Sequence, residues 1–357
     1  MNRGGGNLFE GTDLEVRIDG LNSKVRDKAT RRMNNLTKPK GSLGKLEDLA
    51  IKIAGIRGEL DPTMEDRYSL VFAGDHGVAA EGVSAYPQEV TVQMLENFIH
   101  EGAAINVLGK NVGSRVRVID VGVASEEVPR PVLERKISKG TKNFLRGPAM
   151  SREEALESIR VGYEVVEELV DSGLDLLGVG DMGIGNTTPS SAITAVMTGE
   201  SPKSVTGRGT GIDEESLRKK VEVVEKGLDT NNPDPENPVE VLAKVGGYEI
   251  GAIAGAYLAG AANQVPVLVD GFITTAGALI AHGLEPGVVD YLIASHCSVE
   301  EGHGVALDKL GLEPLLDLNL RLGEGTGAAL AMHLVEASTS ILNGMYTFEE
   351  AGVSSGG

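Results

Sequence analysis

The sequence of 357 residues contains no tryptophan, and aromatic residues make up only 4% of it. A hydrophobic fraction of 41% together with 48 glycines is nevertheless typical of a globular, turn-rich protein. The core must therefore be built from aliphatic side chains and alanine. A chain of this length can form one large α/β domain and a smaller one.

Cysteine is almost absent, since Cys297 is the only one, and the chain cannot form an internal disulfide. This fits a reducing compartment, and we expect a cytoplasmic protein. The N-terminal stretch has early acidic residues and no apolar run, so we expect no signal peptide. Residues 250–269 carry no charge, but they are rich in glycine and alanine and are interrupted by "NQVP". We expect a buried helix, a turn and a buried strand there rather than a membrane span.

Positive charge is scarce, because 33 Lys and Arg stand against 52 Asp and Glu, for a formal net charge of −19. A surface this acidic repels nucleic acids and anionic membranes, so we expect neither as a partner. A substrate that carries a phosphate would need a few basic residues that form a positive site within this negative field.

Short, β-branched apolar runs predict the strands. They lie at 68–77, 116–122, 174–181, 265–271 and 291–296. Helices are predicted between them, for example at 151–173 and 213–228, which begin with Ser151 and Asp213 as N-caps. Strands that are apolar throughout and alternate with helices predict an α/β fold with a Rossmann-like parallel sheet flanked by helices.

The two ends of the chain have a different pattern. Residues 21–60, apart from a turn at 38–44, and residues 326–344 have the pattern of helices without strands. We expect residues 1–60 and 326–357 to form a discontinuous small helical domain. Residues 61–325 would then form the large Rossmann-like domain that carries the active site.

Polar side chains follow the predicted strands, where ligands bind in open α/β sheets. They are Asp75, His76, Asp120, Asp181, Asp270, Ser295 and His296, with Glu324 further along the chain. This rim is predominantly acidic.

The stretch "GVGDMG" (178–183) follows a strand and matches the G-x-G-x-x-G pattern of dinucleotide-binding folds. Asp181 would occupy the place of the pyrophosphate, and no acidic residue closes a second strand about 20 residues later, as that fingerprint requires. An NAD-dependent oxidoreductase is therefore an alternative interpretation rather than the preferred one.

His296, Cys297 and His303 lie close together in the sequence, but they lack the paired spacing of a zinc site, so we expect no metal. The simpler interpretations are a surface or loop residue for His303 and a small buried residue for Cys297. For His76, the simpler interpretation is a hydrogen-bonded residue at a strand end.

Several strings occur in one order along the chain: "TKPKGSLGKLEDLA", "AGDHGVAAEGVSAYPQEVT", "VGDMGIGNTTPSSA", "VPVLVDGF", "YLIASHCSVEEGH" and "RLGEGTGAALAM". From about residue 20 to about residue 345, this sequence resembles the nicotinate-nucleotide–dimethylbenzimidazole phosphoribosyltransferases of cobalamin lower-ligand assembly. The resemblance implies transfer of the 5-phosphoribosyl group of nicotinate mononucleotide to 5,6-dimethylbenzimidazole, giving α-ribazole 5′-phosphate and nicotinate. It also implies a homodimer that needs no cofactor or metal. A silent homologue that only binds an azole is a further alternative.

The resemblance also assigns roles to residues. It implies that Glu324 is the general base and that Asp181 is the acidic residue of the "GDMG" loop, where the family often has Glu. A helix N-cap is the simpler interpretation of Asp181. An apolar pocket would raise the pKa of Glu324 and the start of the following helix would lower it. The phosphate would be bound by Lys220, Gly183 and Ser298, with Arg208 as an alternative. The base pocket would comprise Tyr86, where some relatives carry Ser, together with Gln93, Met182 and Leu322.

Overall fold

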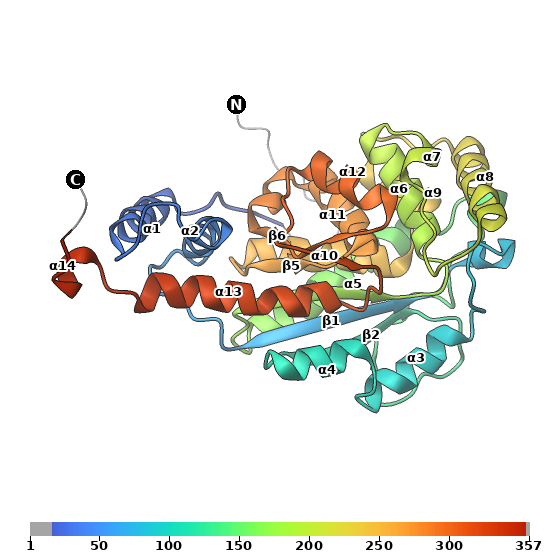
Figure 1. Ribbon diagram of the computed structural model, residues 1–357. Coiled ribbons are helices and arrows are strands. Elements are labelled where there is room, and N and C mark those ends of the chain that lie inside the picture. Colours follow the sequence, from blue (N-terminus) through green and yellow to red (C-terminus); the bar gives the residue numbers. More distant parts are fainter. Residues whose placement is uncertain (1–15, 355–357) are drawn as a thin grey trace.

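The computed structural model describes residues 16–354. Its centre is a six-stranded, all-parallel sheet in the order β3-β2-β1-β4-β5-β6 (Figure 1). The strands are β1 (Arg67–Gly74), β2 (Arg115–Gly122), β3 (Leu133–Glu134), β4 (Leu176–Met182), β5 (Val267–Val269) and β6 (Leu292–Ala294). A separate parallel pair consists of β7 (His296–Ser298) and β8 (Leu316–Leu320). The predicted parallel sheet and its five apolar strands are confirmed.

Helices cover both faces of the sheet (Figure 1). Side chains alternate along β1, so that Leu70 and Phe72 enter one core cluster while Val71 and Ala73 enter the other. The first cluster packs against α5 (Arg152–Val170), α10 (Tyr248–Ala262) and α11 (Phe272–Leu284). The second packs against α3 (Val90–Ile99), α4 (Ala104–Asn111) and α13 (Thr326–Gly344).

Within residues 16–354 there are six further α-helices, besides two N-terminal ones described below. They are α6 (Thr187–Thr198), α7 (Pro202–Val205), α8 (Glu214–Asn231), α9 (Pro238–Val245), α12 (Glu301–Leu310) and α14 (Phe348–Ala351). Both predicted N-caps are confirmed, since Ser151 forms a capping box with Glu154 and the side chain of Asp213 accepts from the N–H of Ser216.

The uncharged stretch at 250–269 forms most of α10, a turn and β5, as the sequence predicts. Within residues 16–354, none of the helices combines the length and the apolar character that crossing a lipid bilayer requires.

The N-terminal helices α1 (Ser23–Asn35) and α2 (Lys45–Arg57) pack on α13. Met33, Ala54 and Leu342 belong to a small core cluster that these three helices share. The beginning of α13, in contrast, contributes Ala328 and Met332 to the core of the sheet. The helix therefore contributes to both clusters, and the predicted division into two domains stays a prediction.

Candidate active site

A cavity of about 490 Å³ opens near the carboxyl ends of β4, β5 and β7. Four of the predicted site residues, Tyr86, Asp181, Ser298 and Leu322, contribute to its wall. They come from four separate segments of the chain, which the parallel sheet brings to one edge. Other residues of the wall include Asn186, Thr187, Thr210, His296, Glu300 and Arg321.

Glu324 lies in a tight turn between β8 and α13, and only 6% of it is exposed. Its φ of 62° is left-handed, as are those of Gly323 and Gly325 at 82° and 88°. The turn packs directly on β4, because a Cβ on Gly180 would collide with the carbonyl carbon of Glu324. Gly178 and Gly180 both lie within β4, so the "GVGDMG" stretch does not form the glycine-rich loop that a dinucleotide site requires.

The carboxylate of Glu324 is held by a helix start, although not by the start of α13. Its Oε2 accepts a hydrogen bond of 3.4 Å from the N–H of Ile105, in the first turn of α4. Burial nevertheless raises the pKa of Glu324, with a smaller contribution from Asp270 in the same direction, while the bond from Ile105 lowers it. The raising effect expected from an apolar pocket is therefore the stronger one, and the lowering effect comes from α4 rather than from the helix that follows Glu324.

Asp181, at the end of β4, is 5% exposed and lies beside the same turn. A Cβ on Gly323 would lie 3.3 Å from both of its carboxylate oxygens. Burial raises the pKa of Asp181 well above its usual range, and the nearby acids Asp270 and Glu249 raise it further. The N-cap interpretation is wrong, because α6 begins after Asn186 and Asp181 accepts its 2.8 Å hydrogen bond from the Asn186 side-chain amide.

Lys220 projects from α8 and is fully buried behind the cavity wall. Its Nζ donates hydrogen bonds to Thr187 Oγ1 at 2.7 Å and to the Gly207 carbonyl at 3.1 Å. Burial lowers the pKa of Lys220 to about 8, against the opposing effect of the nearby Glu300 and Glu301. The lysine thus lies against Thr187, which itself contributes to the cavity wall.

Arg208, the alternative basic residue, is engaged elsewhere. Its guanidinium pairs with Glu214 at 2.5 Å and donates to the Ile212 carbonyl. Arg321 was not predicted from the sequence, although it begins the quoted string "RLGEG". It lies at the cavity wall and donates to the Gly209 carbonyl at 3.3 Å.

The simpler interpretations of His303 and Cys297 differ from what the structure shows, whereas His76 lies where it was expected. His303 is fully buried in α12, where its Nδ1 accepts from the Ser298 N–H at 2.8 Å, so its interpretation as a surface or loop residue is wrong. Cys297 is half-buried rather than buried. His76 is buried at its strand end, and its Nε2 lies 2.9 Å from Oε1 of Glu249. Within residues 16–354, no three His, Cys, Asp or Glu side chains gather into a group that could hold a metal ion.

The predicted base-binding residues divide into two groups. Tyr86 and Leu322 contribute to the cavity wall, and they are 55% and 58% exposed. Met182 is half-buried at the end of β4, Gln93 is exposed on α3, and neither contributes to the wall. Gly183 is buried, and a Cβ there would collide with the Gly74 carbonyl oxygen. The assigned roles of all these residues stay predictions.

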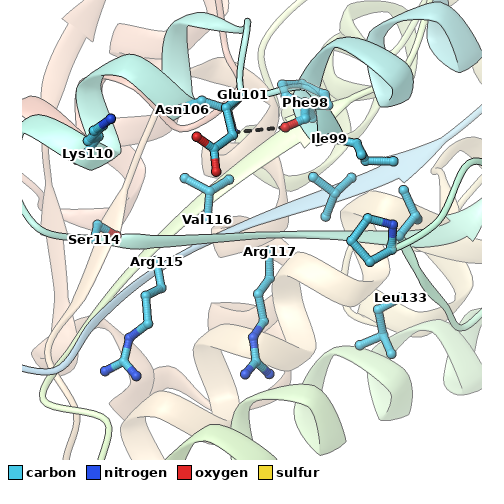
Figure 2. Close-up of a pocket in the computed structure, with 13 residues that line it drawn as sticks. Phe98, Ile99, Glu101, Asn106, Lys110, Ser114, Arg115, Val116, Arg117 and Leu133 are labelled. Carbon is cyan, nitrogen blue, oxygen red and sulfur yellow. Dashed lines mark hydrogen bonds between the residues drawn. The ribbon is translucent and has the colours of Figure 1, made fainter.

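A larger cavity, of about 840 Å³, lies between the α3–α4 helices and the edge of β2 (Figure 2). Lys110, Arg115 and Arg117 contribute to its wall, and the two arginines lie over the ring of Tyr68. It contains none of the predicted site residues and lies along β2 rather than beyond the strand ends.

Comparison with known proteins identifies close relatives of the chain. Residues 18–353 match a family model described as a phosphoribosyltransferase. The nicotinate-nucleotide–dimethylbenzimidazole phosphoribosyltransferase of Geotalea uraniireducens is 54% identical over 342 residues, which is 96% of this chain and 97% of that protein. The enzyme of the same name from Geobacter sulfurreducens is 53% identical, over 97% of this chain and 98% of the relative. A crystal structure from Thermus thermophilus, described as CobT, has a TM-score of 0.90 at 49% identity, covering 93% of this chain and all of that one.

Proposed function

The chain belongs to the nicotinate-nucleotide–dimethylbenzimidazole phosphoribosyltransferase family, and from this premise we propose how its own residues carry out the transfer. The reaction moves the 5-phosphoribosyl group of nicotinate mononucleotide to 5,6-dimethylbenzimidazole. Its products are α-ribazole 5′-phosphate and nicotinate. Because the chain belongs to this family, we prefer this reaction to the alternative interpretation as an NAD-dependent oxidoreductase.

Departure of nicotinate needs little help from the enzyme. The glycosidic C–N bond breaks, its electron pair goes to the ring nitrogen, and the cationic pyridinium leaves as a neutral ring. Positive charge then develops on the anomeric carbon and ring oxygen of the ribose, where a buried carboxylate stabilises it. Asp181 is suited to this role, since it lies at the cavity wall in a low-dielectric environment. The developing cation in turn favours the ionised form of Asp181 over the protonated form.

Glu324 is suited to the role of general base. One nitrogen of the benzimidazole forms the new C–N bond to the ribose, and the proton of its other nitrogen passes to the Glu324 carboxylate. The observation that carries this proposal is a buried carboxylate beside Asp181 with one oxygen tethered to Ile105. Because burial raises the pKa of Glu324, the residue is a stronger base than an exposed glutamate.

Lys220 is proposed to bind the 5′-phosphate. Its ammonium group is buried and contacts Thr187 and Gly207, while Arg208 is paired with Glu214. A phosphate that displaces the contact with Thr187 would gain a charge-assisted hydrogen bond. Ser298 lies at the wall of the same cavity and is suited to donate its hydroxyl.

We further propose that the enzyme is a homodimer, as the resemblance implies, and that it is cytoplasmic, as its single cysteine indicates. Light scattering coupled to size-exclusion chromatography tests the dimer, which would have twice the chain mass of 37.4 kDa. The activity itself is tested by incubation with nicotinate mononucleotide and dimethylbenzimidazole. Release of nicotinate together with a product of the mass of α-ribazole 5′-phosphate is expected, and binding without release would identify a silent homologue.

A further inference from the structure

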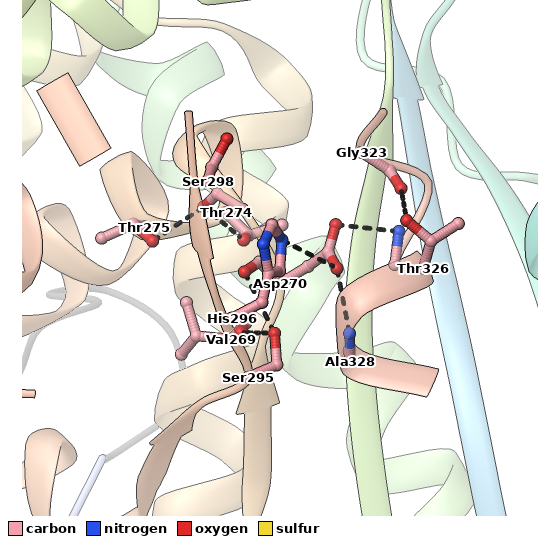
Figure 3. A network of polar contacts seen from close by, with 12 residues as sticks. Val269, Asp270, Thr274, Thr275, Ser295, His296, Ser298, Gly323, Thr326 and Ala328 are labelled. Carbon is pink, nitrogen blue, oxygen red and sulfur yellow. Dashed lines mark hydrogen bonds and ion pairs between the residues drawn. The ribbon is translucent and has the colours of Figure 1, made fainter. Parts of the chain in front are cut away.

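Asp270 connects the end of β5 to the first turn of α13 (Figure 3). It is 1% exposed, and its two carboxylate oxygens accept backbone hydrogen bonds from Gly325 at 3.2 Å and from Ala328 at 3.0 Å. The N-cap of α13 is Gly325, which offers no side chain. Asp270 therefore satisfies N–H groups that the start of this helix would otherwise leave without a partner.

The bond to Gly325 fixes the peptide that directly follows Glu324. Glu324 adopts a left-handed φ of 62°, which a residue with a side chain adopts only when its surroundings hold it there. Asp270 supplies part of that restraint from 55 residues away. Thr326 closes the turn on itself by donating its hydroxyl to the Gly323 carbonyl at 2.9 Å.

His296, on β7, lies on the other side of Asp270. Its Nε2 is 3.9 Å from Oδ1 of Asp270, and Figure 3 shows the ring between that carboxylate and β7. The ring also packs tightly on α13, because a Cβ on Gly327 would collide with His296 Cδ2. Any shift of the His296–Asp270 pair would therefore move the first turn of the helix.

We infer that Asp270, supported by His296, is a positioning residue for the transfer, which holds the Glu324–Gly325 peptide so that the Glu324 carboxylate faces the acceptor. The inference rests on the proposed role of Glu324. Asp270 itself contacts backbone groups and His296 rather than the reacting atoms. Because Asp270 accepts from N–H groups at the start of α13, Glu324 does not have to cap the helix that follows it.

Asp270 has an electrostatic effect on Glu324 as well. The carboxylate of Asp181 on β4 lies beside this turn and interacts with Asp270, and His296 and Tyr257 of α10 are the other titratable groups near Asp270. Repulsion from Asp270 adds to burial in raising the pKa of Glu324. Removal of this charge would lower that pKa, so the acidic limb of the kcat profile would move to lower pH.

The variant Asp270→Asn tests the inference, because it keeps the shape and removes the charge and one acceptor. We expect kcat to fall by about tenfold or more, since small misplacements of a catalytic group cost up to about 100-fold. The KM for nicotinate mononucleotide should stay within about twofold, and the acidic limb should move to lower pH. In a Glu324→Gln background the same substitution should cost less than about threefold, because it acts through Glu324.

An equal loss of kcat in both backgrounds, or a native kcat and pH profile in Asp270→Asn, would overturn the inference. If Asp270→Asn does not fold, His296→Gln is tested instead, both alone and in the Glu324→Gln background. An equal loss of kcat in both backgrounds, or a native kcat and pH profile in His296→Gln, would then overturn the inference. Ser151→Ala is the matched control, since it removes a helix cap on α5 and should lower Tm without moving kcat or the pH profile. Glu324→Gln alone separates the two hypotheses, because near-native turnover there contradicts the general base and not the geometry of Asp270.

Discussion

The backbone N–H of Ile105, in the first turn of α4, donates a hydrogen bond of 3.4 Å to Oε2 of Glu324, which lies 219 residues later in the chain. A helix start thus holds this carboxylate, but it belongs to α4 and not to α13, the helix that follows Glu324. The start of α13 is occupied by Asp270. Two acidic side chains are therefore held by different helices: Asp270 accepts from the start of α13, and Glu324 accepts from the start of α4 beside Gly323 of the cavity wall.

The raised pKa of Glu324 predicts how turnover depends on pH. A general base must be ionised, so activity is lost as the pH falls through the pKa of Glu324 in the enzyme. Because burial raises this pKa, the acidic loss of kcat should begin at a higher pH than an exposed glutamate would give. Measurement of kcat across the acidic and neutral pH range at saturating substrates checks this. An acidic limb at the pKa of free glutamate would contradict the burial of the base.

Asp181→Asn should slow the transfer and leave the protein at least as stable at neutral pH. The pKa of Asp181 is raised in the folded state, so the folded state binds its proton more tightly than the unfolded state does. The contribution of Asp181 to the stability of the folded state therefore falls as the pH rises from its unfolded pKa through its folded pKa. The variant removes that loss, and its Tm should exceed that of the native enzyme more at mildly alkaline than at mildly acidic pH.

The Tm of Asp181→Asn and its kcat together separate two roles. A lower Tm with a native kcat would indicate a structural acid. A preserved Tm with a kcat reduced by about tenfold or more would support the electrostatic role, for which single preorganised groups are worth about 100-fold or more.

Lys220→Ala should raise the KM for nicotinate mononucleotide. A hydrogen bond to a charged group contributes about 1.5–3 kcal/mol, which corresponds to about 10- to 150-fold in KM. The pKa of Lys220 is lowered to about 8 by burial, so the native KM should also rise as the pH increases through that value. Arg208→Ala is the control, since Arg208 pairs with Glu214 and should leave this KM unchanged. The opposite pattern would assign the phosphate to Arg208.

Tyr86→Ser should change which lower base the enzyme prefers. The Tyr86 ring is 55% exposed and contributes to the cavity wall, as Leu322 does, so its removal enlarges the space available to a flat aromatic acceptor. Competition among benzimidazoles, adenine and phenols, with products identified by mass spectrometry, measures the preference. Tyr346→Ser, at a residue that is 67% exposed and outside the cavity, should leave the preference unchanged.

The sheet and its edge could be predicted from the sequence because their signals are local. Apolar β-branched runs specified the strands, and the glycines before residue 326 specified the start of α13. The same local signals predicted Asp181 at a strand end, where parallel sheets bind ligands, whereas β8, which precedes Glu324, was not predicted.

The partners of these acids could not be predicted, because they depend on contacts between distant segments. Nothing near Asp270 in the sequence indicates that it accepts from Gly325, and nothing near Ile105 indicates Glu324. The pKa of Glu324 depends on burial and on a neighbouring acid, which only packing determines. His303 was placed at the surface for the same reason, since its partner, the N–H of Ser298, becomes visible only when α12 folds against β7.

Glu324→Gln tests the proposed mechanism most directly. The amide keeps the size of the side chain and can still accept from Ile105, but it cannot take the proton of the benzimidazole. General base catalysis is worth about 10²- to 10⁴-fold, and kcat should fall by that factor with little change in the KM for nicotinate mononucleotide. Glu313→Gln, at an exposed residue outside the cavity, is the matched control and should be fully active. Turnover of Glu324→Gln near that of the native enzyme would contradict the assignment of Glu324 as the base.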